Sequence, residues 1–141
     1  MFKKFLIPVD LTEPDLTKQA LDEALAIAKG ANAQLRLVNV QSLVPVAFID
    51  YIPPNFDEEL RTAAEQEIAE VAAKIDYPQG LVSTVVRFGA IYPEVLAEAE
   101  EWGADLIVLS SHRPAMSTYL LGSNAKTIVR HAKCSVLVVR R

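Results

Sequence analysis

Short apolar runs and longer segments of helical periodicity alternate along the whole of this chain. The apolar runs largely lack the apolar–polar alternation of a strand with one solvated face, so each is typical of a strand buried on both faces. Helices between such strands supply the crossovers that parallel pairing requires. We therefore expect a doubly wound α/β fold, a five-stranded parallel sheet with helices on both faces. The expected strands are 5–9, 34–40, 81–89, 104–110 and 135–140, and the expected helices are 13–29, 57–74, 92–103 and 123–132.

The length of 141 residues fits one domain, which we place at residues 1–141, and it is enough to bury a core. The chain has one cysteine, which excludes a disulfide framework and a cysteine-based metal site. The first apolar run is broken by Pro8 and Asp10 and is too short for a signal peptide, and no segment approaches the length of a membrane span. We therefore expect a cytoplasmic protein without membrane association.

Charge is distributed unevenly between the two parts of the chain. Residues 1–105 carry eight Lys and Arg against eighteen Asp and Glu, whereas residues 106–141 carry six Lys and Arg and no acid. Two interpretations are open: the basic end is a chance feature of one side of the fold, or it forms a local anion site. Nucleic-acid binding is not expected, because it needs a broad basic surface and the rest of the chain is acidic.

Ligands of open parallel sheets bind beyond the carboxyl ends of the strands, where the winding reverses. Three expected strand ends are candidates, at residues 8–10, 38–40 and 109–113, and the last expected helix begins near Ser123. If the first and fourth strands are neighbours, Asp10 and the loop after Ser110 face each other across one crevice. The free N–H groups of a helix start, together with Gly122 and Arg113, would make an anion cradle. Neither a G-x-G-x-x-G nor a G-x-x-x-x-G-K-[ST] motif is present, so a plain strand-to-helix turn is the alternative.

Four stretches of the chain resemble the universal stress protein family, and together they extend over nearly its full length. They are IPVD (7–10), VRFGAIYPEV (86–95), ADLIVLSSHR (104–113) and LLGSNAKTIVRHAKCSVLVVR (120–140). The resemblance implies a Rossmann-like fold similar to that of the adenine nucleotide alpha hydrolases. It also implies that the protein binds ATP or a related adenine nucleotide. Mg²⁺ is expected with the nucleotide, because triphosphates usually carry it. The function implied is that of a stress-response sensor or switch with little or slow hydrolysis.

The phosphate motif of the family is glycine, two residues, glycine, nine residues, then glycine followed by Ser or Thr. Here Ser110 replaces the first glycine, Arg113 takes the place of the second, and eight residues rather than nine precede Gly122. Fewer glycines leave fewer positions free to adopt positive φ, a loss that Arg113 could offset with charge-assisted hydrogen bonds. The resemblance places adenine against Asp10 and the backbone of Val40. The nucleotide site implied in this way comprises Pro8, Val9, Asp10, Val40, Leu109, Ser110, His112, Arg113, Gly122, Ser123 and Asn124.

A dimeric interaction module of the same fold that binds no nucleotide is the alternative function. Residues 41–56 form an expected long apolar loop with three prolines, which either recruits a protein partner or packs onto its own domain. The strand 135–140 is apolar on both faces and would lie at an edge of the sheet. There it either pairs with a second copy or is covered by a loop of its own chain. The family resemblance implies the homodimer.

Catalysis is not expected from the polar groups near the fourth strand. Ser111, His112 and Asp10 are the residue types of a catalytic triad, but neighbouring residues on an extended loop point in different directions. His131 and Cys134 are too few ligands for a metal site. We assign no catalytic residue and no metal ligand, and we expect slow ATP hydrolysis at most.

Overall fold

The computed structural model describes residues 1–42, 50, 51, 53–110 and 123–140. These residues form five strands and four α-helices in the order expected from the sequence, with bounds within a few residues of the expected ones. A short 3₁₀ turn at Gln79–Leu81 leads into the third strand. The bounds are β1 Lys4–Pro8, α1 Pro14–Ala28, β2 Gln34–Gln41, α2 Phe56–Ala73, β3 Val82–Phe88, α3 Ile91–Trp102, β4 Leu106–Ser110, α4 Ser123–His131 and β5 Ser135–Val139.

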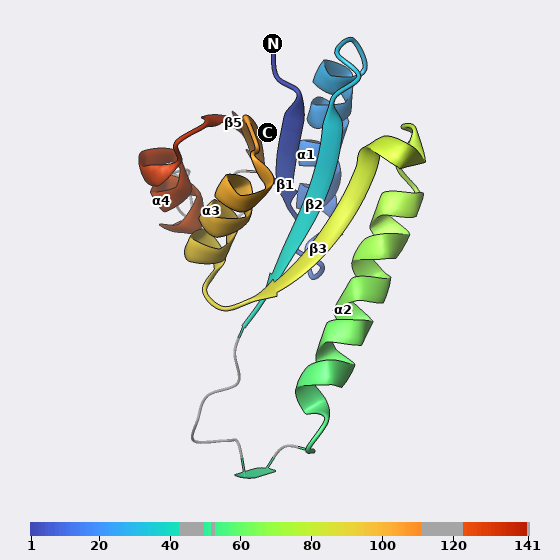
Figure 1. Cartoon of the computed structure of the whole chain (residues 1–141), viewed down its shortest axis with the longest axis vertical. Helices are drawn as coiled ribbons and strands as arrows, with labels where there is room; N and C mark the ends of the chain where they lie inside the picture. The colour runs from blue at the N-terminus through green and yellow to red at the C-terminus, as the bar shows by residue number, and fades with distance from the viewer. Residues whose placement is uncertain (43–49, 52, 111–122, 141) are drawn as a thin grey trace.

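The five strands form one parallel sheet in the order β3-β2-β1-β4-β5. Helices α1 and α2 cover one face of this sheet, and α3 and α4 cover the other (Figure 1). Each face has its own core: Phe5 packs with Ile68 of α2, whereas Leu6 packs with Ile128 of α4. Neighbouring residues of one strand point to opposite faces, so a strand between two helical layers must be apolar throughout. The predicted doubly wound α/β fold is confirmed.

The start of α1 differs from what its sequence indicates. Thr12 lies just before the helix, and threonine is a common N-cap residue. The N-cap is instead Glu13, whose side chain makes no capping hydrogen bond, and Pro14 is the first helical residue. Thr12 donates to Asp10 Oδ1 from both its N–H (2.9 Å) and its Oγ1 (2.6 Å). The Asp10 carboxylate therefore closes a turn after β1. Thr12 is hydrogen-bonded within this turn and does not cap α1.

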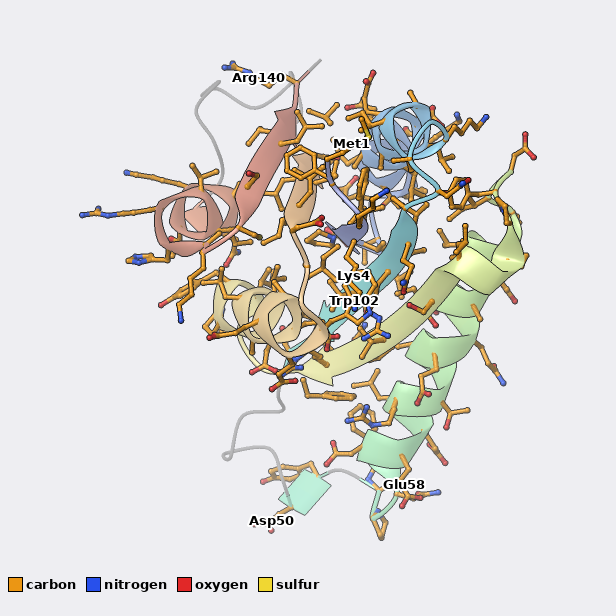
Figure 2. All side chains as sticks on the ribbon, turned by 45° about the horizontal axis from the view of Figure 1, so that its top comes forward. Met1, Lys4, Asp50, Glu58, Trp102 and Arg140 are labelled. Carbon is orange, nitrogen blue, oxygen red and sulfur yellow. The ribbon has the colours of Figure 1, made fainter. Side chains whose placement is uncertain are left out.

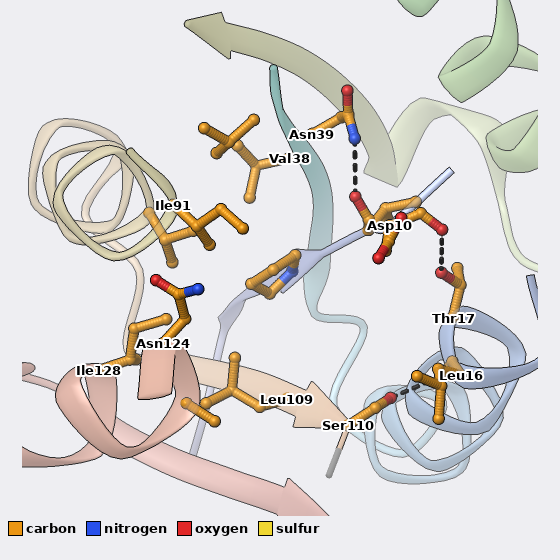
Figure 3. A pocket seen from close by; sticks show the side chains of 15 residues that line it. Asp10, Leu16, Thr17, Val38, Asn39, Ile91, Leu109, Ser110, Asn124 and Ile128 are labelled. Carbon is orange, nitrogen blue, oxygen red and sulfur yellow. Dashed lines mark hydrogen bonds between the residues drawn. The ribbon is translucent and has the colours of Figure 1, made fainter. Parts of the chain in front are cut away.

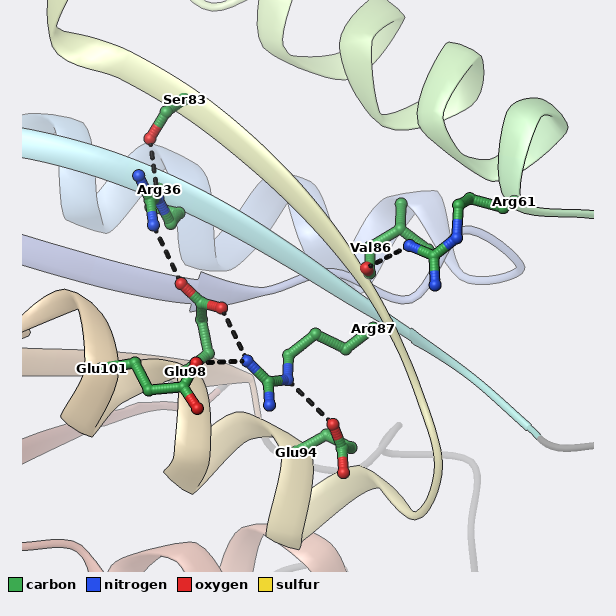
Figure 4. A network of polar contacts seen from close by, with 8 residues as sticks. All are labelled: Arg36, Arg61, Ser83, Val86, Arg87, Glu94, Glu98 and Glu101. Carbon is green, nitrogen blue, oxygen red and sulfur yellow. Dashed lines mark hydrogen bonds and ion pairs between the residues drawn. The ribbon is translucent and has the colours of Figure 1, made fainter. Parts of the chain in front are cut away.

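A polar network attaches α3 to the face formed by β2 and β3 (Figure 4). Glu98 is only 5% exposed and accepts hydrogen bonds from Arg36 (2.9 Å) and Arg87 (3.0 Å). Arg87, on β3, also forms ion pairs with Glu94 (2.8 Å) and Glu101 (3.0 Å), which lie on α3 like Glu98. These hydrogen bonds, first of all the one to Glu94, raise the pKa of Arg87 above its ordinary value. The network holds α3 against the sheet along most of its length.

At the end of α3, the Trp102 ring meets two cationic side chains. The Arg36 guanidinium lies 4.7 Å from the ring centroid and Lys4 Nζ lies 5.3 Å from it. Lys4 Nζ also donates a hydrogen bond to the Trp102 main-chain carbonyl (3.1 Å), and Figure 2 shows the two labelled residues together. Cation–π attraction and this hydrogen bond connect the start of β1 to the end of α3.

Two features that the sequence marked as interaction surfaces have different outcomes. β5 lies at one edge of the sheet and pairs only with β4 among the described residues, which confirms its predicted position. The expected loop 41–56 falls between β2 and α2, but residues 43–49 and 52 lie outside the described part of the chain, so its role stays a prediction. Across the described residues, no helix is long and apolar enough to cross a membrane.

Candidate functional site

A cavity of about 370 Å³ opens at the carboxyl ends of β1, β2 and β4 (Figure 3). The chain winds from β1 toward β2 and, on the other side, from β4 toward β5, so the winding reverses between β1 and β4. Ligands of open α/β sheets bind at this position, and the volume suits a small molecule. The cavity is lined by Pro8, Val9, Asp10, Leu16, Thr17, Val38, Asn39, Val40, Ile91, Val95, Leu109, Ser110, Asn124, Ala125 and Ile128.

The cavity brings together much of the site that the sequence implies. Ser123 is the first residue of α4, next to the cavity wall, whereas His112, Arg113 and Gly122 lie outside the described residues and stay predictions. The implied residues that line the cavity are Pro8, Val9, Asp10, Val40, Leu109, Ser110 and Asn124. Val38 and Asn39 also line the cavity; the sequence offered the strand end 38–40 as a candidate, but only Val40 was assigned to the nucleotide site. Sequence reasoning missed Leu16, Thr17, Ile91, Val95, Ala125 and Ile128.

The turn after β1 presents Asp10 to the cavity. Its Oδ1 is engaged by Thr12, as described above. Its main-chain carbonyl accepts hydrogen bonds from the Glu13 N–H (3.0 Å) and from Thr17 Oγ1 (3.3 Å). Among the described residues, none donates to the second carboxylate oxygen, Oδ2. The backbone of Asp10 is thus held from two sides, and within the described part of the chain Oδ2 is open to a hydrogen-bond donor of a ligand.

The end of β2 presents a main-chain donor and acceptor on one residue. Val38 faces β1, because its carbonyl accepts a hydrogen bond from the Val9 N–H (2.8 Å). Alternation along a parallel strand turns the N–H and C=O of Val40 toward β1 as well, but β1 has ended at that point. The Val9 carbonyl, which would face the Val40 N–H, accepts a hydrogen bond from Asn39 Nδ2 instead (2.8 Å). Val40 therefore offers an N–H and a C=O side by side at the cavity.

The β4 side of the cavity leads to the start of a helix. The Ser110 hydroxyl donates to the Leu16 carbonyl of α1 (2.5 Å), so its side chain is directed at that helix (Figure 3). Asn124 and Ala125, in the first turn of α4, form part of the wall. The first N–H groups of a helix lack intrahelical partners and carry the positive end of its dipole. This wall of the cavity is therefore suited to an anion.

Apolar side chains form the remaining wall. Val95, Leu109 and Ile128 are each at most 5% exposed, and Ile91 is 45% exposed at the rim. An apolar wall next to a few hydrogen-bonding groups is typical of sites that bind heterocyclic ligands. Within the described part of the chain, no group of three His, Cys, Asp or Glu residues could hold a metal ion.

Comparison with known proteins assigns the chain to a family. Residues 1–140 match the sequence profile described as the universal stress protein family. The chain belongs to this family. Universal stress protein G of Shigella flexneri is 34% identical to it over 142 residues, which cover 99% of this chain and 100% of that relative.

Solved structures of other universal stress proteins have the same fold. UspA of Lactobacillus plantarum has a TM-score of 0.74 at 25% identity and covers 99% of this chain and 98% of its own. A family protein of Arabidopsis thaliana, solved with AMP bound, has a TM-score of 0.67 at 18% identity, with 99% and 92% covered. A universal stress protein solved in complex with cAMP has a TM-score of 0.62 at 24% identity, with 98% and 96% covered. The Rossmann-like architecture expected from the family resemblance is thereby confirmed.

Proposed function

We propose that this universal stress protein binds an adenine nucleotide in the cavity between β1 and β4. The observation that carries the proposal is the donor and acceptor of Val40, which lie with the Asp10 carboxylate at the point where the winding of the sheet reverses. Two family members of the same fold support it, one with AMP bound and one in complex with cAMP.

The Watson–Crick edge of adenine is complementary to these groups. It carries an acceptor, N1, beside a donor, the N6 amino group. In the proposed complex the Val40 N–H donates to N1, and the N6 amino group donates to the Val40 carbonyl or to Asp10 Oδ2. Guanine presents the opposite pattern, with a donor at N1 and an acceptor at O6. The site is therefore expected to bind adenine in preference to guanine.

We place the phosphates at the first turn of α4. Unpaired N–H groups at a helix start favour an anion there, and residues 106–141 contain basic side chains and no acid. In this proposal Arg113 and Gly122 complete the phosphate site, as the family resemblance implies. Mg²⁺ would be held by phosphate oxygens and water, which is its usual mode of binding to nucleoside triphosphates.

We propose a sensor or switch and at most a slow ATPase. Asp10 is the one carboxylate among the described residues that line the cavity. Its Oδ1 holds the turn after β1 and its Oδ2 faces the base in the proposed complex, so it is not placed to orient a water molecule at the phosphates. If the bound nucleotide is hydrolysed only slowly, the fraction of sites that are occupied follows the concentration of the nucleotide. A sensor requires this property.

Thermal unfolding with and without ATP and Mg²⁺ tests the proposal. A ligand at one hundred times its Kd stabilises the folded state by about 2.7 kcal/mol, which raises the Tm of a domain of this size by several degrees. We expect this shift in the wild type and a smaller one in Arg113→Ala. Arg130→Ala, in the exposed last turn of α4 and outside the cavity, is the matched control and should retain the full shift. A folded wild type that shows no shift with millimolar ATP, AMP or cAMP would contradict nucleotide binding and favour the interaction module.

We also propose that two copies of the chain form a homodimer through β5. Residues 136–139 of this edge strand are apolar and only half-buried, and an apolar edge favours pairing with another chain. Antiparallel pairing of two β5 strands would give a closed symmetric dimer. Sedimentation velocity should show a dimer for the wild type and a monomer for Val138→Lys. Val129→Lys, at a 44% exposed apolar position on α4, should stay dimeric, and a monomeric wild type would contradict the proposal.

A further inference from the structure

Asn39 is a buried polar residue whose amide is hydrogen-bonded at both ends. It is 4% exposed, and its Nδ2 donates to the Val9 carbonyl (2.8 Å; Figure 3). Its Oδ1 accepts a hydrogen bond from Gln41 Nε2. The Val9 carbonyl determines the orientation of the Asn39 amide, because a carbonyl oxygen can only accept a hydrogen bond. The donor end of Asn39 therefore faces Val9.

The hydrogen bond from Asn39 replaces one rung of the ladder between β1 and β2. The Val9 N–H still donates to the Val38 carbonyl (2.8 Å), so the two strands are in register up to this residue. In a ladder continued by one bond, the next rung would join the Val40 N–H to the Val9 carbonyl. The Asn39 amide donates to that carbonyl in place of the Val40 N–H, and main-chain pairing stops one bond earlier than the register allows.

We propose that Asn39 is a positioning residue that keeps the Val40 N–H free for the N1 acceptor of a purine base. It thereby sets the base preference of the cavity, and this inference rests on the nucleotide binding proposed above. Without the Asn39 amide, the Val9 carbonyl lacks its donor, and an unpaired buried carbonyl is unfavourable. In the register of the ladder, the next main-chain donor for this carbonyl is the Val40 N–H. In a variant without this amide, the Val40 N–H would bond to the Val9 carbonyl, and N1 of the base would lose its hydrogen-bond donor.

Amide hydrogen exchange tests the first step in the protein without ligand. In the wild type, the Val40 amide should exchange quickly, whereas the Val38 amide is protected within the ladder. In Asn39→Ala, protection of the Val40 amide should increase about tenfold as the additional bond forms. Asn55→Ala is the matched control, because it removes an asparagine whose Nδ2 pairs with Glu59 on α2, outside the cavity. The Val40 amide should exchange in this variant as in the wild type.

Calorimetric titration with ATP and with 1-deaza-ATP, in which N1 is replaced by C–H, tests the second step. The wild type should bind ATP about fivefold more tightly than the analogue, the effect of one hydrogen bond. In Asn39→Ala, ATP binding should weaken about fivefold and the preference for ATP over the analogue should disappear. Asn39→Leu has a similar size and shape without any hydrogen-bond donor, and it replaces the alanine variant if that one does not fold.

The outcomes separate this inference from the proposed function. If a folded Asn39 variant keeps the fivefold preference for ATP, or if its Val40 amide stays unprotected, the positioning role of Asn39 is wrong. A wild type that binds ATP and 1-deaza-ATP equally well overturns the N1 contact. A wild type that binds no ATP overturns the proposed function and the base preference with it, while the exchange experiment still decides whether Asn39 interrupts the ladder.

Discussion

The Ser110 hydroxyl at the end of β4 donates a hydrogen bond of 2.5 Å to the main-chain carbonyl of Leu16 in α1. The winding of the sheet reverses between β1 and β4, and this hydrogen bond joins β4 to α1, the helix that follows β1. The family motif has a glycine where this chain has Ser110, so the bond also shows where the additional side chain is accommodated. It is directed at Leu16 of α1, and Ser110 also lines the cavity (Figure 3).

Replacing Ser110 with alanine should therefore affect stability more than binding. The loss of one partly buried hydrogen bond should lower the free energy of unfolding by about 1 kcal/mol, measured by urea titration. The affinity for ATP should change less than twofold, because the hydroxyl is already engaged by the Leu16 carbonyl. A tenfold loss of affinity in Ser110→Ala would instead mean that the hydroxyl leaves α1 and binds the nucleotide.

Glu98→Gln should destabilise the protein clearly. Glu98 is 5% exposed and receives hydrogen bonds from Arg36 and Arg87, so neutralising it leaves two guanidinium groups around one uncharged amide. Both arginines keep some contact with solvent, and we expect a loss of about 2 kcal/mol in the free energy of unfolding. Lys18→Ala is the control, because its ion pair with Asp22 is exposed and should contribute nothing measurable. Equal stabilities of the two variants would contradict a structural role for the network.

Cys134 should react slowly with alkylating reagents near neutral pH. Burial disfavours the thiolate and raises the pKa of the thiol above its ordinary value. Because the folded state holds this proton more firmly than the unfolded state, the contribution to stability is complete below the unfolded pKa and is lost as the pH rises through the folded pKa. The chain has one cysteine, so the rate of iodoacetamide labelling against pH reports on it alone. The midpoint should be higher in the folded protein than in urea, and coincident midpoints would contradict this prediction.

Gly122→Val should abolish the thermal shift produced by ATP. The prediction comes from the sequence, since Gly122 begins the terminal pair of the family's phosphate motif and a β-branched side chain there would meet the phosphates. Gly80→Val is a suitable control, because a Cβ at Gly80 has no atom within 4 Å. The control should keep the full shift. Unchanged ATP affinity in a folded Gly122→Val protein would remove this residue from the proposed phosphate site.

Local patterns predicted the elements of this fold well, and some of its turns less well. The apolar run 104–110 contains β4, and the helical periodicity of residues 57–74 matches α2 to within one residue at each end. Thr12 is a residue type that commonly caps a helix, yet it binds Asp10. Periodicity over ten residues reports burial of a face, whereas a cap depends on whether the chain brings the side-chain oxygen within reach of a free N–H of the first helical turn.

The sequence by itself determined the order of the elements, the parallel sheet and the strand ends at which a ligand could bind. These properties follow from local periodicity and from the general rule that places ligands at the carboxyl ends of strands. Only the tertiary structure decided that Asn39 binds Val9, thirty residues away, and that Ser110 binds Leu16, 94 residues away. Such contacts depend on strand register and on how each helix packs, and both are set by the whole core. The sequence around each residue does not contain that information.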